Sequence, residues 1–365
     1  ETVHDWSVMS ATASENRDPN RHHWLLEFLM EDPLREEASF IDCGRLCALQ
    51  GAINQQEWRV VELFHRLLDY LTPKLSHPYQ LLRERIGSVL TNIFALDLPT
   101  SGPRRTRGPL ISQFVADIMP QLLCLYSLSD VTSSQPQPTT SNAEATVNQM
   151  EVDILSKSDV DLNEDGRSTA ICLLKTMVKW VTNSVVRADY SAVPEFFGFL
   201  PLVCLMENYE ADDELNKICT AMLAAMAQCL ILPEFLPTAL TAINEVAEMS
   251  SWSARATCLD FLQVFVFHNL PTISTQESLV SQVNSLVLRL LKDERVEVRE
   301  KAGQVLSGLI HCGFVTDKET LMKELKRLAS KQKKGGTNDI AKRHAGVLGL
   351  CAFISANPYD VIDPV

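Results

Sequence analysis

Apolar side chains recur at helical spacing through most of the chain, and the stretch from Leu290 to Phe314 shows the pattern most clearly. Its apolar residues follow one another at intervals that place them on one face of an α-helix: Ala302, Val305, Leu306, Leu309 and Ile310. Small Ala302 and Gly303 allow another helix to approach closely, and Gly313 is a typical C-terminal stop. Asp293 lies where the preceding helix gives way to this one. The stretch therefore predicts one hairpin of two helices.

The same pattern returns at a fixed period. Arg255, Arg299 and Arg343 are 44 residues apart (299 − 255 and 343 − 299), and a step of 88 residues back from Arg255 leads to Arg167. Apolar residues follow each of these four arginines at seven and ten positions, and Arg83 gives one more match. A period of about 40–47 residues is typical of HEAT and armadillo repeats, which stack helical hairpins into a superhelix. We therefore predict an all-α fold, a HEAT/armadillo-like α-solenoid.

Three segments are expected along the chain. Residues 1–128 and 166–365 carry the helical pattern and are predicted to form HEAT-like repeats. Residues 129–165 are rich in Ser, Thr, Gln and Pro and then acidic, so they are predicted to be a disordered insertion in one solenoid. Breaks between helices in the last segment are expected at Pro194, Pro201, Pro233, Pro237, Pro271, Gly313, Gly335 and Gly336.

Composition narrows the class of protein. The 365 residues are 46% apolar but only 7% aromatic, which favours aliphatic packing between helices. A net charge of −13 argues against direct binding of DNA. No apolar run reaches the roughly 18 residues that cross a bilayer, so no membrane association is predicted. No CxxC pair occurs among the ten cysteines, and residues such as Cys219, Cys229 and Cys258 fall on apolar helical faces, so reduced, buried thiols are expected.

Known motifs for catalysis are lacking. The sequence contains no serine-histidine-aspartate elbow, phosphate loop or kinase-like set, so we predict that the chain is not an enzyme. Asp161, Asn163 and Asp165, followed by Gly166, resemble the start of a calcium-binding EF-hand loop. The glutamate that such a loop needs at its twelfth position is replaced by Cys172. We therefore expect no metal and interpret this stretch as an acidic turn that caps a helix.

Two basic clusters stand out on this acidic chain. The first is Arg104, Arg105 and Arg107, in a loop bounded by glycines and prolines. The second lies further on and comprises Lys326, Arg327, Lys331, Lys333 and Lys334, with Lys342 and Arg343 shortly after. Clustered cations attract polyanions, so both are candidates for binding a polyphosphate ligand or an acidic protein surface. The alternative is a solvated helix face and a flexible loop.

Phe267 and Asn269 are candidates for binding acetyl-lysine. A neutral acetylated side chain is recognised by an aromatic wall and by a hydrogen bond from an asparagine amide, and these two residues end an aromatic run just before Pro271. The sequence favours the alternative, in which the phenylalanines pack in a core and Asn269 caps a helix C-terminus.

Three stretches resemble one known family, the large HEAT-repeat proteasome activators. They are residues 22–33 (HHWLLEFLMEDP), residues 293–314, and residues 341–361, which begin AKRHAGVLGLCAF. The resemblance covers nearly the whole chain and about the last fifth of a family member, and it identifies the chain as a C-terminal fragment or a truncated isoform.

The resemblance implies a function that the residue pattern alone does not. Members of the family cap the α-ring of the 20S proteasome without ATP or ubiquitin, in the nucleus and cytoplasm, and promote degradation of peptides and of acetylated core histones in DNA repair and spermatogenesis. It also implies an acetyl-lysine-binding, bromodomain-like region at about 230–325, and inositol polyphosphate binding by basic residues, with no other cofactor.

One feature of the family is missing. Its members end in a hydrophobic-Tyr-X tail that opens the proteasome gate, whereas this sequence ends Ile362-Asp363-Pro364-Val365. Gate opening by this chain alone is therefore not expected. The alternative function is that of a general HEAT-repeat scaffold that binds a partner helix in a concave face.

Overall fold

The computed structural model describes residues 21–54, 56–99, 108–127, 155–330 and 337–359, and these are organised as helices without a β-strand. The predicted all-α, HEAT-like fold is thus confirmed. The chain divides into two compact units, Glu1–Asp189 and Tyr190–Val365. Among the described helices, none has the length and apolarity to cross a membrane.

The first unit is built from short helices and one long helix. In chain order its elements are α2 (Arg21–Leu29), α3 (Phe40–Ile53), α4 (Glu57–Val60), η1 (Val61–Leu63), α5 (Phe64–Leu71), η2 (Thr72–Lys74), α6 (Gln80–Ile93), η3 (Ala95–Asp97), α7 (Ile111–Leu122), η5 (Leu123–Ser127) and α9 (Leu155–Arg187). The rings of Phe94, Phe114 and Trp180 lie 5.0–5.2 Å apart and join α6, α7 and α9 in one core.

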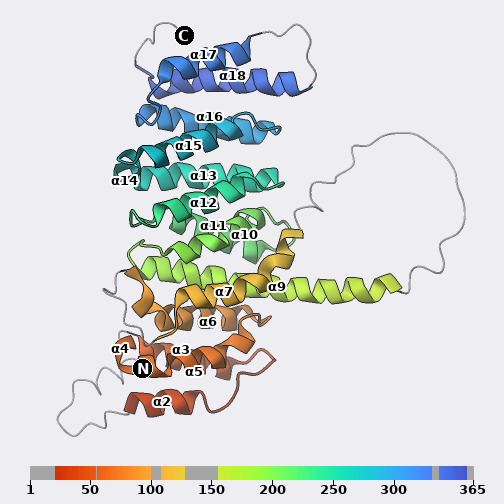
Figure 1. Ribbon diagram of the computed structural model, residues 1–365. Coiled ribbons are helices and arrows are strands. Elements are labelled where there is room, and N and C mark those ends of the chain that lie inside the picture. Colours follow the sequence, from red (N-terminus) through yellow and green to blue (C-terminus); the bar gives the residue numbers. More distant parts are fainter. Residues whose placement is uncertain (1–20, 55, 100–107, 128–154, 331–336, 360–365) are drawn as a thin grey trace, which may run out of the picture. The chain divides into compact units, whose positions relative to one another are not determined.

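The second unit is a series of helical hairpins that follow one another in chain order (Figure 1). Its elements are η6 (Pro194–Phe199), α10 (Leu200–Met206), α11 (Asp213–Ala227), α12 (Leu236–Ala247), α13 (Trp252–His268), α14 (Leu270–Ser274), α15 (Glu277–Leu290), α16 (Val296–His311), α17 (Lys318–Ala329) and α18 (Thr337–Ala356). Within it α13 packs on α16, and α16 on α18, so the second helices of successive hairpins contact each other. Gly313, with φ of 78°, ends α16 as predicted.

Prolines begin helices more often than they separate them. Pro201, Pro237 and Pro271 lie in the first turns of α10, α12 and α14. The first amide groups of a helix have no acceptor within it, so a proline costs nothing there. The breaks between helices that are predicted at these three prolines therefore fall just N-terminal to each proline.

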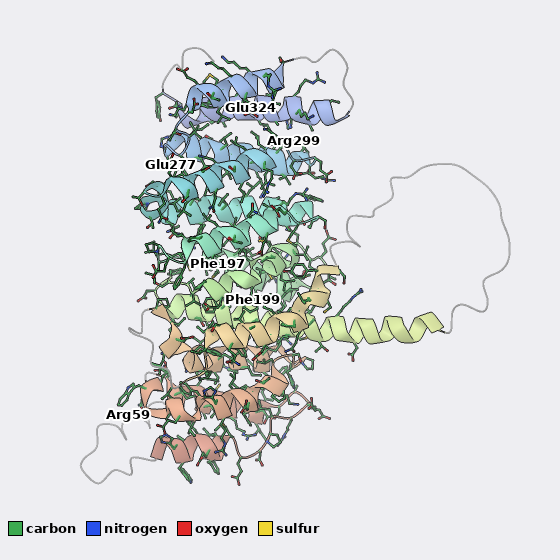
Figure 2. The ribbon with its side chains drawn as sticks, viewed as in Figure 1. Arg59, Phe197, Phe199, Glu277, Arg299 and Glu324 are labelled. Atoms are coloured by element: carbon green, nitrogen blue, oxygen red, sulfur yellow. The ribbon has the colours of Figure 1, made fainter. Side chains whose placement is uncertain are left out.

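Buried arginines close the turn before three of the helices. The Nη1 atom of Arg255 donates to the carbonyls of Met249 and Ser250 at 2.7 and 2.9 Å. Arg299 (labelled in Figure 2) donates in the same way to Asp293 and Glu294 at 2.7 and 2.8 Å. In each case the acceptors lie six and five residues earlier. These carbonyls lie in the turn that follows the preceding helix, and the guanidinium supplies the donors that they lack.

Arg83 repeats this arrangement in the first unit. Its Nη1 atom donates to the carbonyls of His77 and Pro78 at 2.8 and 2.5 Å. Arg83, Arg255 and Arg299 are only 3–7% exposed, so these bonds lie out of water.

The same arginines contact the next hairpin. Arg255 binds both carboxylate oxygens of Asp293, at 2.8 and 3.0 Å, in the turn that Arg299 closes. The Nε atom of Arg299 in turn donates to Nδ1 of His344 on α18 at 3.1 Å. Each turn-closing arginine of the second unit therefore fixes its own hairpin and its position against the following one.

Arg167 and Arg343 share the sequence period but not this role. Helix α9 begins at Leu155 and α18 at Thr337, so the residues five and six positions before each arginine already lie inside a helix. The apolar phase still holds at Leu174, Met177 and Phe353, which are at most 1% exposed. The period thus predicts most of the buried face, with Leu350 only partly buried, and overestimates the number of equivalent turns.

The structure differs from the predicted insertion at its C-terminal end. Residues 155–165, predicted to be disordered, belong to α9, and the predicted acidic turn at 161–166 lies inside this helix. Helix α9 packs on α6 and α7 and so belongs to the first unit, although the sequence groups it with the following repeats. The buried side chains of its second half, including Trp180, explain this. The rest of the insertion, 129–154, lies outside the described residues.

We predict that Arg255→Met lowers the free energy of unfolding by about 3 kcal/mol, because Asp293 is left buried without its partner. Arg289→Met is the matched control. Arg289 also bonds two side chains, Glu248 and Asn244, but its side chain is 44% exposed, so its loss is expected to cost less than about 1 kcal/mol. Urea unfolding followed by circular dichroism measures both. Equal losses would contradict the role assigned to the turn-closing arginines.

Candidate functional surfaces

The second basic cluster begins on the last turn of α17. Lys326 and Arg327 lie there, and both side chains are exposed. Cations at a helix C-terminus interact favourably with the helix dipole, so a structural role accompanies any binding role. Lys331, Lys333 and Lys334, and all of Arg104, Arg105 and Arg107, lie outside the described residues.

Helix α17 is held very close to α18. A Cβ atom on Gly346 would overlap backbone atoms of Leu325 and Ala329, and one on Gly349 would overlap the Leu325 side chain. The approach therefore requires glycine at position 346, where the overlap is with backbone, whereas the Leu325 side chain would have to shift to admit a Cβ atom at position 349. The contact places the C-terminal end of α17 beside the first half of α18, where Lys342 is exposed and Arg343 partly exposed. Basic residues that are separated in the sequence thus lie on the two packed helices at one end of this hairpin.

Acidic residues lie further back along α17. Glu319 pairs with Lys323 at 3.8 Å, and Glu324 (Figure 2) pairs with Lys292 of the preceding hairpin at 2.8 Å. These pairs involve Lys323 on α17 and Lys292 of the preceding hairpin. Lys326 and Arg327 are exposed at the C-terminal end of α17, and Lys342 is exposed on α18. We call this set, Lys326, Arg327 and Lys342, the basic hairpin end.

The structure does not place Phe267 and Asn269 as an acetyl-lysine site requires. Asn269 is only 2% exposed, and its amide is fully used by the backbone. Its Oδ1 accepts from the Ile231 amide at 2.9 Å, and its Nδ2 donates to the carbonyls of Cys229 and Phe265 at 2.8 and 3.0 Å. Phe267 is 68% exposed. Asn269 is instead the C-cap of α13, the alternative that the sequence favours.

Asn269 also joins two segments that lie far apart in the sequence, a contact that the sequence pattern does not predict. It ties the segment Cys229–Ile231, which lies before α12, to the end of α13. The partners are 38 and 40 residues away, and they bond through backbone atoms, which carry no sequence signal.

The predicted buried thiols are found at half of the cysteines. Cys43, Cys204, Cys219, Cys229 and Cys258 are buried, while Cys47, Cys124, Cys312 and Cys351 are exposed, and Cys172 is intermediate. Burial raises the pKa of Cys229 and of Cys258 to about 12, so these thiols are protonated at neutral pH. They act as small apolar core residues and not as nucleophiles.

We predict that Asn269→Ala lowers the free energy of unfolding by about 3 kcal/mol, because a buried amide and buried carbonyls lose their partners. Phe267→Ala removes a larger side chain but an exposed one, so we expect a loss below about 1 kcal/mol. Thermal and urea unfolding compare the two variants. A larger loss for Phe267→Ala would contradict the structural role of Asn269.

Comparison with known proteins supports the resemblance noted in the sequence. Residues 1–51 match the family described as proteasome activator complex subunit 4-like, HEAT repeat-like. Over 99% of its length the chain is 40% identical to proteasome activator complex subunit 4A of Danio rerio and 39% identical to proteasome activator complex subunit 4 of Homo sapiens. Proteasome activator subunit 4 of Arabidopsis thaliana is 25% identical over 82% of the chain.

The match covers only part of these relatives. The chain spans 20% of the length of the fish and human proteins and 17% of the plant protein. Over nearly its whole length, this chain is therefore a homologue of one part of the proteasome activator complex subunit 4 proteins.

Proposed function

We propose that the chain is a structural part of an activator that caps the 20S proteasome and promotes peptide degradation without ATP or ubiquitin. It acts by binding and positioning, through the exposed faces of its helical hairpins, and performs no chemistry itself. Contact with the α-ring and opening of its gate belong to the activator as a whole.

The observation that carries this proposal is the continuous match to the activators. Identity of about 40% extends over 99% of the chain, so it includes both compact units and not a single repeat. The buried turn-closing arginines are compatible with any HEAT-like scaffold, whereas a match along the whole chain favours the activator over the general scaffold.

The test uses the native protein purified from cell extract in its longest expressed form. We expect 20S particles to co-purify with it after ATP is removed with apyrase, and the complex to hydrolyse a fluorogenic peptide faster than free 20S particles do. A protein that carries no 20S particles would contradict the proposal and favour the general scaffold. Association that disappears with ATP would contradict the ATP-independent part alone.

We further propose that the basic hairpin end binds a polyanion such as an inositol polyphosphate. Lys326, Arg327 and Lys342 are exposed there, and the close packing of α17 on α18 holds their backbone in place. The neighbouring residues Lys331, Lys333 and Lys334 add charge in the sequence. A fixed group of cations on an acidic protein is a local site for phosphate groups.

We expect that Lys326→Gln with Arg327→Gln weakens binding of inositol hexakisphosphate and flattens its dependence on salt. Glutamine preserves helix propensity, so the change is one of charge. Lys301→Gln is the control, because Lys301 lies on α16 and pairs with Asp260. Isothermal titration at two salt concentrations measures all three proteins. Unchanged affinity in the double variant would remove the basic hairpin end from the proposal.

Acetylated core histones are proposed as substrates through the same family resemblance. In this proposal Asn269 stabilises the fold and takes no part in reading acetyl-lysine. Recognition of the modified side chain would use other residues of the activator.

A further inference from the structure

The first unit contains a cavity that no function discussed so far uses. It has a volume of about 330 Å³ and lies between η2, α7 and α9. Its lining comes from residues between positions 72 and 173, which are brought together by the packing of α7 and of the middle of α9.

The floor of the cavity is apolar. Leu75, Ile118, Ala170 and Leu173 line it and are at most 3% exposed. Such a floor gains free energy by contact with a hydrocarbon chain and offers nothing to a strongly hydrated ion.

The rim is polar, and its donors are already used within the protein. The Thr72 hydroxyl donates to the Leu68 carbonyl at 2.8 Å, and the Thr169 hydroxyl donates to the Asp165 carbonyl at 2.9 Å. The Gln121 amide donates to the Asp117 carbonyl at 3.2 Å. The two hydroxyls and the amide can therefore still accept hydrogen bonds from a ligand, mainly through the oxygen lone pairs of Thr72, Thr169 and Gln121.

Asp165 adds a negative charge to these acceptors. Asp165 lines the cavity and is exposed. The nearest lysine in η2, Lys74, is directed elsewhere, since it pairs with Glu36. A rim of acceptors with one carboxylate selects a ligand that donates hydrogen bonds and carries positive charge.

We propose that this cavity binds a primary ammonium group on an unbranched aliphatic stem. The stem lies on the floor formed by Leu75, Ile118 and Leu173, and the ammonium donates its three hydrogens to Asp165 and to the neighbouring acceptors. The lysine side chain of a protein partner has this chemistry, and so does a free aliphatic diamine.

The test follows the methyl signals of Leu75, Ile118 and Leu173 by NMR in the full chain. The ligands are Nα-acetyl-lysine amide, the corresponding norleucine amide, which keeps the stem and lacks the ammonium, and cadaverine. We expect the lysine amide to shift the Ile118 methyl signal and to bind about two- to fivefold more tightly than the norleucine amide. Tighter binding of the lysine amide than of cadaverine identifies a protein side chain as the source, and the reverse order identifies a free amine.

Three variants complete the test. Asp165→Asn removes the charge at the rim and is expected to abolish the preference for lysine over norleucine. Thr169→Leu places a bulky, helix-compatible side chain at the mouth and is expected to weaken both ligands. Asp117→Asn is the matched control, because Asp117 lies on α7 one turn from Gln121 and does not line the cavity.

Two results would overturn the proposal. One is equal binding of the lysine and norleucine amides, or no shift of Ile118 with either. The other is an equal loss in Asp165→Asn and Asp117→Asn, which would reveal general electrostatic attraction in place of a site. Melting temperatures of the variants establish that each is folded when it is compared.

Discussion

The hydrogen bonds of the buried arginines Arg255 and Arg299 are the interaction on which two successive helical hairpins of the second unit depend. A turn between two helices leaves carbonyl groups without donors, and in a stacked array the neighbouring hairpin keeps water from them. Arg255 and Arg299 satisfy these carbonyls and reach the next hairpin with the remaining nitrogens. One side chain therefore determines both the shape of a hairpin and its register against the following one.

This construction explains why function is expected on surfaces. The interior of each unit consists of aliphatic and aromatic contacts, and its buried polar groups serve the turns and caps, as Asn269 does. What remains for recognition is the set of side chains that the hairpins hold at their ends and along their exposed faces. The basic hairpin end and the acceptor-lined cavity are two such places with opposite charge preference.

The fold could be predicted from the sequence because its determinants are periodic. Buried positions such as Leu306 and Phe353 repeat with the helical spacing, and Gly313 is a local signal. The true start of α9 could not be predicted, since its first turns are acidic and polar and resemble a loop. The role of Asn269 and the cavity beside Asp165 depend on contacts between distant segments, for which the sequence holds no pattern.

Hydrogen exchange in an Arg299→Met variant tests the central claim most directly. The account predicts faster amide exchange in the turn from Asp293 to Arg299 and, across the interface, in α18 around His344, with the first unit unchanged. Faster exchange confined to α16, with α18 protected as before, would contradict the claim that this arginine holds successive hairpins together.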